Sequence, residues 1–420
     1  MCEAKNENIR RRVVITGLGV ISSAGNNVDT FWENIKNGKC GVDFIKSFDT
    51  EGFKVKVAAE VKDFVPENYM DKKLSKRMDR YCQFAMAAAR QAVENSEINL
   101  DEVQKERFGV IVSSGVGGIS TFEKQQRVLM EKGPNKVSPL FIPMMIGNMA
   151  SGNIAIEFGA KGICMDIVTA CATGTNSIGE AYRKIAYDEA DIMLAGGAEA
   201  SITPLAVAGF ASMTALSRST DPKRASIPFD KERNGFVMGE GAGVILMESL
   251  EHAKKRGAQI YAEIAGYGVS CDAYHMTSPS PDGEGAARAM KLAIDDAEVS
   301  SEDISYINAH GTSTVYNDKF ETIAIKRVFK DYAYNIPVSS TKSVTGHLLG
   351  AAGGVEAIIC AKSIKEGYIP PTAGYKEKDE ECDLNYTPCT GKKADVRYAM
   401  SNSFGFGGHN AVIILKRWDD

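Results

Sequence analysis

The amino-acid sequence predicts an α/β protein built from two similar halves. Uninterrupted apolar runs at residues 107–118 and 190–200 end in glycine-rich turns, a pattern typical of central parallel strands with helices on both faces. Similar segments return in the same order later in the chain: 260–268 resembles 12–19, 304–311 resembles 107–118, and 405–415 resembles 239–247. We therefore expect a first half of residues 11–255 and a second half of residues 256–420.

The first strand, RVVITGLG at residues 12–19, reaches a Gly-x-Gly pair. A dinucleotide-binding turn would also need a third glycine and an acidic residue at the end of the next strand. Both are missing, so the sequence predicts a turn that ends the strand and not a nucleotide site.

Residues 69–93 have the pattern of one amphipathic helix. Its apolar stripe consists of Leu74, Met78, Tyr81, Ala85 and Ala88. Its basic residues recur at i, i+3, i+4 and i+7, which puts them on a second shared face: Lys73, Lys76, Arg77 and Arg80. Most charge runs are simply solvated; the alternative is a docking face for an acidic partner.

The stretch 166–187 contains the candidate nucleophile, Cys171. Short apolar residues at 167–169 predict the end of a buried strand, and the apolar spacing from Ile178 to Ile185 predicts a helix. Cys171 then lies on a strand-to-helix turn, where free N–H groups and the helix dipole stabilise a thiolate. The alternative is a small buried apolar residue, as most free cysteines are.

Three of the five histidines, His310, His347 and His409, lie in glycine-rich turns. A cysteine with a histidine makes an activated nucleophile with an acid/base partner. A second, neutral imidazole can donate its N–H to an enolate or oxyanion. Lys342, five residues before His347, adds positive charge, and the turn at 405–408 can bring a backbone N–H to an oxyanion. These turns favour a catalytic Cys171.

Composition narrows the class of protein. The net charge of −5 gives no reason to expect nucleic acid as a partner. Nine cysteines, an odd number with no C-x-x-C spacing, argue against zinc or a disulfide framework and favour a reducing compartment. The N-terminus has no secretory pattern, and the longest nearly uncharged apolar run, 204–216, is too short to span a membrane. We expect a protein of the cytoplasm, or of an organelle matrix with any transit peptide absent, with no metal and no membrane contact.

Four motifs resemble one known family, the β-ketoacyl-acyl carrier protein synthases, and among them the elongating type II enzymes most. They are TACATG around Cys171, AHGTST at His310, TKSVTGHLLGAAG through His347, and NSFGFGGHN at 402–410. The motifs occur in the family's order, and the resemblance runs from about residue 11 to the C-terminus.

The resemblance implies a thiolase-type fold of five layers, α-β-α-β-α, as a homodimer without a cofactor. It implies Cys171, His310 and His347 as the catalytic residues and Lys342 as a supporting residue. The backbone N–H groups of Cys171 and Phe406 would form an oxyanion hole, and Phe406 would also gate the acyl pocket.

The resemblance also implies where substrates bind. Val116 would line the acyl pocket, and Phe404 would contact substrate. Thr312 and Thr314 would contact the pantetheine or malonyl group. The basic residues Lys73, Lys76 and Arg77 would dock acyl carrier protein.

The implied reaction is a decarboxylating carbon–carbon condensation in fatty acid elongation. Acyl carrier protein delivers an acyl group to Cys171. Malonyl-acyl carrier protein then loses CO2, and the enolate, stabilised by His310 and His347, attacks the acyl thioester. The product is a β-ketoacyl group two carbons longer.

Four other functions compete with fatty acid elongation. A thiolase needs a second catalytic cysteine near the C-terminal glycine turn, and residues 402–410 contain none. The initiating synthase has asparagine where this chain has His347. A type II polyketide ketosynthase shares all the chemistry and stays open as the main alternative. A non-catalytic partner subunit commonly lacks the nucleophile, whereas Cys171 is present.

Overall fold

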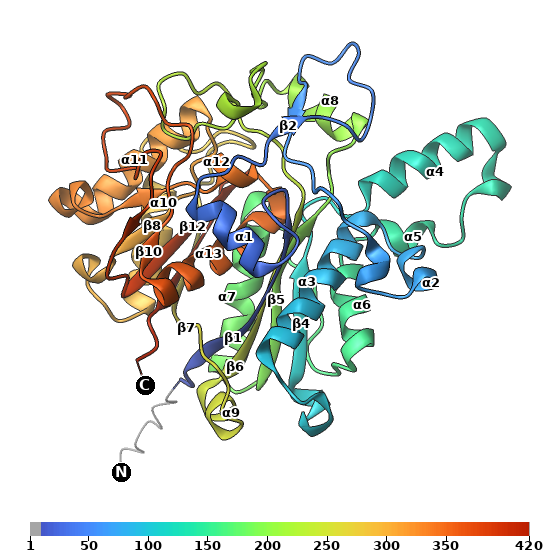
Figure 1. Ribbon diagram of the computed structural model, residues 1–420, viewed down its shortest axis with the longest axis horizontal. Helices are drawn as coiled ribbons and strands as arrows, with labels where there is room; N and C mark the ends of the chain where they lie inside the picture. The colour runs from blue at the N-terminus through green and yellow to red at the C-terminus, as the bar shows by residue number, and fades with distance from the viewer. Residues whose placement is uncertain (1–9, 420) are drawn as a thin grey trace.

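The computed structural model describes residues 10–419. Within this range, nine strands form one mixed sheet (Figure 1). In spatial order they are β4 (Phe108–Ser113), β5 (Ile192–Glu199), β6 (Gly241–Ser249), β1 (Val13–Ser22), β7 (Ala262–Cys271), β13 (His409–Lys416), β12 (Tyr398–Gly405), β8 (Tyr306–Asn308) and β9 (Val338–Ser339). Two small ribbons pair β2 (Asp43–Phe44) with β3 (Val57–Ala58) and β10 (Tyr368–Ile369) with β11 (Lys392–Lys393).

The pairing pattern of the sheet confirms two similar halves. β4 pairs with β5 in parallel, and β5–β6 and β6–β1 are antiparallel. β8 likewise pairs with β12 in parallel, and β12–β13 and β13–β7 are antiparallel. The halves meet where β1 pairs with β7. The expectation of central parallel strands was therefore wrong in part, because β4 lies at the sheet edge and β5 has one antiparallel neighbour. The division of the chain after residue 255 stays a prediction.

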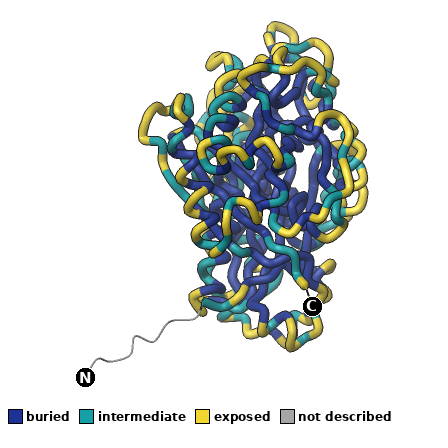
Figure 2. Tube along the Cα trace, turned by 90° about the vertical axis from the view of Figure 1, so that its left-hand side faces the viewer, coloured by how far each residue is buried: buried dark blue, intermediate teal, exposed yellow. Residues whose placement is uncertain are grey.

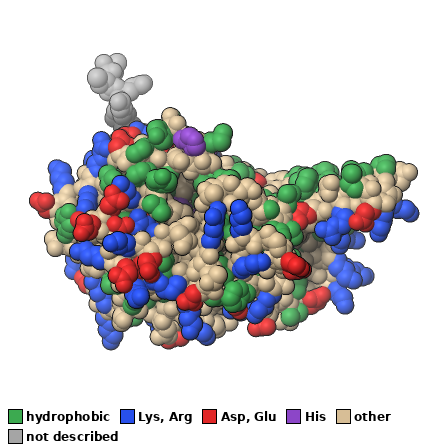
Figure 3. All heavy atoms as spheres, turned by 90° about the horizontal axis from the view of Figure 1, so that it is seen from above, with side chains coloured by type: hydrophobic (Ala, Val, Ile, Leu, Met, Phe, Trp, Pro, Cys, Tyr) green, Lys and Arg blue, Asp and Glu red, His purple; other side chains and the backbone are tan. Residues whose placement is uncertain are grey.

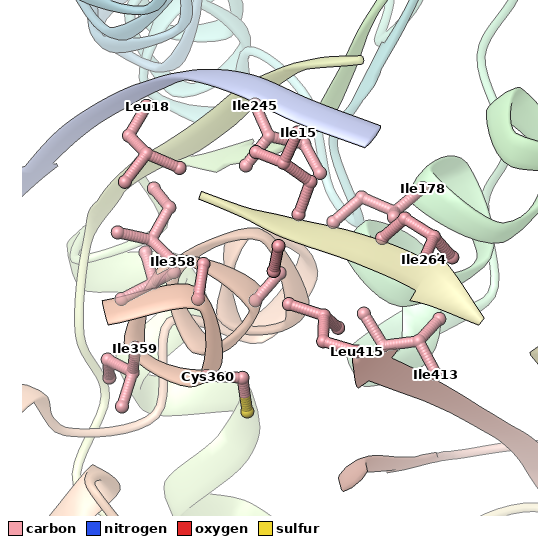
Figure 4. Packing of buried hydrophobic residues seen from close by; sticks show 14 of the residues in the cluster. Ile15, Leu18, Ile178, Ile245, Ile264, Ile358, Ile359, Cys360, Ile413 and Leu415 are labelled. Carbon is pink, nitrogen blue, oxygen red and sulfur yellow. The ribbon is translucent and has the colours of Figure 1, made fainter. Parts of the chain in front are cut away.

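Helices complete five layers, α-β-α-β-α, as expected. Two helices, α7 (Thr173–Ala186) and α13 (Ala352–Glu366), lie between the halves of the sheet and contribute to the largest apolar cluster together with strands of both halves. Figure 4 shows Ile178 of α7 and Ile358 of α13 pointing into this shared core. α3 (Arg80–Ser96) and α6 (Met149–Phe158) cover the outer face of the first half, and α10 (Glu284–Asp296) and α11 (Val315–Phe329) that of the second.

The remaining helices and turns lie around these layers. The other helices are α1 (Val28–Lys36), α2 (Lys72–Ser75), α4 (Ile119–Lys132), α5 (Phe141–Met145), α8 (Pro204–Ser212), α9 (Leu250–Lys255) and α12 (Lys342–Thr345). The 3-10 turns are η1 (Pro66–Asn68), η2 (Leu100–Glu102), η3 (Lys105–Arg107), η4 (Pro134–Lys136), η5 (Ala170–Ala172), η6 (Pro222–Arg224), η7 (Ser301–Asp303), η8 (Lys330–Tyr334) and η9 (Leu349–Ala351). Exposed residues lie mainly on the outer helices and the loops, whereas the long strands of the sheet and the middle helices are mostly buried (Figure 2). No helix in residues 10–419 is long and apolar enough to cross a membrane.

The glycines of the first strand lie inside β1, so the predicted turn there was wrong. A Cβ atom at Gly17 would overlap the carbonyl oxygen of Ala92, and one at Gly19 would overlap that of Ala88. α3 therefore packs on β1 at backbone distance, which only glycine permits. In the second half, Gly268 of β7 allows the same close approach of α10.

The predicted helix at 69–93 is two helices, α2 and α3. Asp79 caps α3 by accepting from the backbone N–H of Tyr81, and it also accepts from the side chains of Ser120 and Thr121. Arg80, at the start of α3, pairs with the buried carboxylate of Glu240 at 2.7 Å, and its side chain stays 39% exposed. Arg80 lines the same hollow as Lys76, and Lys73, Lys76 and Arg77 are exposed, so the shared basic face stays a prediction.

Candidate active site

Cys171 lies in η5, the single turn that precedes α7. The segment before it is extended but pairs as a strand only at Cys164, and the Val168 side chain is 57% exposed. The expectation of a buried strand end was therefore wrong, while the predicted helix after Cys171 is confirmed. Ala170 has a left-handed φ of 51°, a strained conformation that persists only where the surrounding structure holds it.

A glycine contact brings the starts of α7 and α13 together. A Cβ atom at Gly174 would lie 2.8 Å from the backbone nitrogen of Gly354 and 2.9 Å from the carbonyl oxygen of Gly350. The two helices therefore touch through their backbones just after η5 and η9. This contact puts Cys171, from the first half of the chain, beside the turn that follows His347, from the second.

A cavity of about 370 Å³ contains the expected nucleophile and both histidines. Seven of the residues expected at the site line it: Cys171, His310, Thr312, Thr314, His347, Phe404 and Phe406. They come from η5, from the turns after β8 and α12, and from the end of β12 and the turn that follows it. These residues, up to 235 positions apart in the sequence, therefore converge on one cavity.

The two histidine rings face each other edge to face, with centroids 5.3 Å apart and planes at 86°. Phe404 packs against His310 at 5.7 Å, and Phe236 packs against His347 at 5.3 Å. His347 Nδ1 accepts the backbone N–H of Leu349 at 3.3 Å, which leaves Nε2 to carry the proton. Among the described residues, His310 Nδ1 is buried without a hydrogen-bond partner.

Burial and positive charge keep both imidazoles neutral. Burial lowers the pKa of His310 and of His347 well below the usual 6.5, and the nearby Lys342 lowers both further. A neutral imidazole has one nitrogen that accepts and one that donates. Each histidine can thus take up a proton or hold an anionic oxygen.

The Cys171 thiol is also neutral at rest. Burial raises its pKa to about 12, and this outweighs Lys342 and the backbone N–H groups of Phe406 and of Cys171 itself, which lower it. The expected stabilisation by the helix end is therefore overcome by desolvation. The nucleophile has to lose its proton to a neighbour during the reaction, and the neutral histidines can accept it.

Lys342 lies behind the cavity and not in its wall. Its side chain is buried and forms an ion pair with Glu356 of α13, which is also buried. Burial raises the pKa of Glu356 to about 7 even though Lys342 opposes this shift. Lys342 acts on the site through its charge, because it affects Cys171 and both histidines without lining the cavity.

Two buried carboxylates that the sequence analysis missed hold the histidine loop. Glu321 accepts the backbone N–H groups of His310 at 2.8 Å and Gly311 at 2.7 Å. Asp318 accepts those of Thr312 at 2.9 Å and Ser313 at 3.1 Å. Both lie on α11, three residues apart, so the spacing of two acids on the helix after AHGTST was the available signal.

The turn after β12 brings Phe406 to the nucleophile. The Phe406 ring packs 6.3 Å from that of Phe210, and the backbone N–H of Phe406 is directed to the Cys171 sulfur. A Cβ atom at Gly405 would lie 2.7 Å from the Thr169 carbonyl oxygen and 3.0 Å from the Cys171 nitrogen. Glycine at 405 is therefore required for this approach.

The structure does not bring the remaining expected residues to this cavity. Val116, in the loop after β4, is 43% exposed and lies outside the cavity lining, so its place in an acyl pocket stays a prediction. Lys73, Lys76 and Arg77 are exposed on and just after α2, and their docking role also stays a prediction.

Comparison with known families identifies the class of protein. Residues 10–253 match the model described as "Beta-ketoacyl synthase, N-terminal domain", and residues 261–376 match "Beta-ketoacyl synthase, C-terminal domain". The chain belongs to the β-ketoacyl synthase family.

Curated relatives within this family carry a more specific name. The chain is 52% identical to "3-oxoacyl-[acyl-carrier-protein] synthase 2" of Staphylococcus aureus (strain COL) over 409 residues, which is 97% of this chain and 99% of that protein. It is 50% identical to the protein of the same name from Synechocystis sp. (strain ATCC 27184 / PCC 6803 / Kazusa) over 410 residues, 97% of this chain and 99% of that one.

Solved structures of ketosynthases share the fold. The chain superposes with a TM-score of 0.92 and 40% identity on "The ishigamide ketosynthase/chain length factor", over 98% of this chain and 100% of that one. A type II polyketide ketosynthase in complex with its acyl-carrier protein gives a TM-score of 0.91 and 37% identity over 97% and 100% of the two chains. The expected thiolase-like fold is confirmed.

We predict that Gly405→Ala abolishes most of the activity. The added methyl would push the β12 turn away from Cys171, and a displacement of about 1 Å at a reacting group costs roughly a hundredfold in rate. The measurement is kcat for condensation together with the thermal unfolding midpoint.

The matched control is Gly209→Ala in α8, where a Cβ atom would meet nothing within 4 Å. This change should leave kcat near wild type and stabilise the helix slightly. Equal activity in the two variants would show that the 405 turn does not position the nucleophile.

Proposed function

We propose that the chain catalyses the decarboxylative Claisen condensation of malonyl-acyl carrier protein with an acyl group held on Cys171, in fatty acid chain elongation. The observation that carries this proposal is the convergence of one cysteine and two neutral histidines in a single cavity. The names of the relatives, 52% identical over nearly the whole chain, support the same activity.

In the first half-reaction, Cys171 sulfur attacks the carbonyl carbon of the acyl thioester. A new carbon–sulfur bond forms as the bond to the pantetheine sulfur breaks. The thiol proton passes to one of the neutral histidines and then to the departing thiolate. During the attack the carbonyl oxygen becomes an oxyanion, and the N–H groups of Cys171 and Phe406 are suited to hold it.

In the second half-reaction, malonyl-acyl carrier protein loses CO2, and the electron pair of the broken bond forms an enolate. The N–H of a neutral imidazole stabilises the enolate oxygen without the cost of ionising the ring. The enolate carbon attacks the acyl group on Cys171, and the thiolate of Cys171 leaves. A proton taken up from solvent through a histidine restores the thiol, because the original thiol proton left with the carrier protein. Thr312 and Thr314, whose hydroxyls lie 2.9 Å apart in the cavity, would contact the pantetheine or malonyl group.

A ketosynthase of a type II polyketide pathway is the alternative function, because it uses the same chemistry. Structures of such enzymes are 37% and 40% identical to this chain, against 52% for the fatty acid relatives, and this difference favours fatty acid elongation. The non-catalytic partner subunit is disfavoured because the nucleophile and both histidines are present.

We predict that Cys171 is the only cysteine to become acylated. After incubation with acyl-acyl carrier protein, mass spectrometry should find the acyl group on the peptide containing Cys171, and Cys171→Ala should carry none. Cys271→Ala is the matched control, because Cys271 is exposed and its thiol lies outside the cavity lining. Acylation that persists in Cys171→Ala would refute the proposed function.

We further propose that Lys73, Lys76 and Arg77 dock acyl carrier protein. All three are exposed, and none forms an ion pair within residues 10–419. Lys76 borders a hollow of about 320 Å³ that Lys124 of α4 also lines. Figure 3 shows Lys and Arg side chains gathered on the right-hand part of the molecule, where Figure 1 places α2 and α4. Such a surface steers an acidic partner.

We predict that the double change Lys76→Glu and Arg77→Glu raises KM for acyl carrier protein by about tenfold, since charges at the rim of an interface act mainly on encounter. Turnover of a small pantetheine thioester should stay near wild type. The control is Lys392→Glu with Lys393→Glu, two exposed lysines of β11. Equal losses on both substrates would show that residues 76 and 77 support the fold instead.

We also propose that the protein is a homodimer. The backbone of residues 162–165 bonds to β4 around Cys164, and no strand within residues 10–419 pairs with the other side of this segment, which leaves a sheet edge open. Large apolar side chains are exposed near it and on the arm formed by α4 and α5: Phe122, Leu129, Met130, Ile142, Ile156, Met165 and Val168. Open edges and apolar patches of this kind are normally covered by a partner, and a second copy of the same edge can pair with it across a twofold axis.

A reducing, cytoplasmic location is proposed because the eight described cysteines are all free thiols.

We predict a mass in solution of twice the 45.3 kDa of one chain, measured by light scattering. Changing Ile156, which is 79% exposed, and Val168 to glutamate should shift the mass towards a single chain, because each change places a charge in the proposed interface. Tyr187→Glu is the control, on a residue 55% exposed at the far end of α7. A single-chain mass for the unmodified protein would refute the dimer.

A further inference from the structure

Glu199 is a fully buried carboxylate at the end of β5 that the reaction described above does not use. Its Oε2 accepts the backbone N–H of Gly115 at 3.0 Å and that of Gly350 at 3.1 Å. Its Oε1 accepts the hydroxyls of Ser114 and Ser201, each at 3.0 Å. All four donors are neutral, so no cation offsets the charge of this carboxylate at hydrogen-bond distance. Burial raises the pKa of Glu199 to about 7, so the carboxylate is mostly ionised only above this pH.

The carboxylate joins the two halves of the chain at the site. Gly115 belongs to the loop after β4, and Gly350 belongs to η9, directly after His347 and α12. A Cβ atom at Gly115 or at Gly350 would lie 2.9 Å from Glu199 Oε2. The carboxylate therefore fills a space that both loops leave open only because they have glycine there.

The clamped turn is strained and is bonded to a catalytic histidine. Leu349 has a left-handed φ of 49°, and its backbone N–H donates to His347 Nδ1. Strain of this kind persists only where neighbouring groups hold it, and the bond from Gly350 to Glu199 holds the next residue of the turn. Movement of η9 would also move the donor that sets which nitrogen of His347 carries the proton.

The same carboxylate lies close enough to Cys171 for its charge to act on the thiol. The charged and titratable groups around Cys171 are Lys342 from α12, His310 from the loop after β8, His347 from the turn before η9, and Glu199 from β5. Both histidines are neutral. The balance at the sulfur is therefore between one cation, Lys342, which favours the thiolate, and one carboxylate, Glu199, which opposes it.

We propose that Glu199 is a positioning residue for the reaction at Cys171: it clamps the turn that follows His347, and its negative charge adds to the effect of burial in keeping the nucleophile in the thiol form. The proposal rests on the proposed function for its role in condensation. A nucleophile that stays protonated until substrate and histidine are in place is protected from oxidants and stray electrophiles, since only the thiolate reacts.

The decisive experiment measures alkylation of Cys171 by iodoacetamide from pH 6 to 10, with the modified peptide quantified by mass spectrometry. It compares the full-length protein with Glu199→Gln, in which an amide oxygen can still accept both glycine N–H groups without a charge. Above about pH 7, where the wild-type carboxylate is ionised, removing its charge favours the thiolate, so this part of the rate profile should move to lower pH. A shift of one pH unit makes the rate about tenfold faster at a given pH on the rising limb.

The control is Glu263→Gln on β7, a buried carboxylate paired with Arg12, and its profile should coincide with that of the wild type. This assay uses neither carrier protein nor malonyl group, so its result is independent of the proposed function. A Glu199→Gln profile that superimposes on the wild type, or an equal shift in Glu263→Gln, would overturn the proposal.

A second variant tests the clamp. Glu199→Ala leaves both glycine N–H groups without this acceptor, and kcat for condensation should fall at least tenfold while KM for carrier protein changes less than twofold. Glu199→Gln should restore most of kcat, which loss of fold alone would not predict. A kcat equal to that of the wild type in Glu199→Ala would overturn the proposed clamp. If Glu199→Ala does not fold, the test is kcat of Glu199→Gln, and a tenfold or larger loss in that variant would overturn the clamp.

Discussion

The active site depends on the backbone contact between the starts of α7 and α13. Each helix belongs to a different half of the chain, and each begins with small residues, so that a Cβ atom at Gly353 would overlap the side chain of Thr175 and one at Gly174 would press on Gly354. Larger residues would separate the helices by the width of a side chain. That separation would draw Cys171 away from the turn after His347, although neither residue makes the contact itself. Packing in the middle layer thus sets the catalytic distances.

Burial then determines the protonation states with which the chemistry begins. Around the cavity, Cys171 and both histidines are desolvated, and each is shifted towards its neutral form. Charge appears only as the reaction proceeds, on the thiolate, the oxyanion and the enolate, and the site meets it with backbone N–H groups, imidazoles and Lys342. Such preorganised dipoles act strongly in a water-poor cavity. Condensation therefore proceeds by proton transfer among neutral groups, and Lys342 is the one permanent cation that acts on both Cys171 and the histidines.

Much of this site could be predicted from the sequence because its residues occur in short local motifs. Cys171, His310 and His347 each stand in a glycine-rich turn, and the pattern of apolar residues was enough to predict α7 and the strands beside it. Long-range contacts could not be predicted. Gly19 was assigned to a turn because the sequence does not show that α3 packs on β1. The ion pair of Arg80 with Glu240 could not be predicted because the two residues are 160 positions apart. The contacts of Glu199 also could not be predicted, because the N–H groups that it accepts belong to Gly115 and Gly350, 84 and 151 positions away.

The duplicated fold has one active site, and the structure accounts for this asymmetry. η5 and η9 are equivalent turns, each followed by a middle-layer helix and each with a left-handed residue at its start. Cys171 in the first turn corresponds to Gly350 in the second. The last residue of the strand beside each turn also differs between the halves. β12 ends with Gly405, which leaves the Cys171 N–H accessible to an oxyanion. β5 ends with Glu199, which accepts the Gly350 N–H. One half therefore keeps a nucleophile and a free donor, and the other has neither. In the second half, the position equivalent to the oxyanion hole is occupied by the carboxylate of Glu199, which belongs to the first half. Its hydrogen bond to Gly350 therefore links the two halves of the chain.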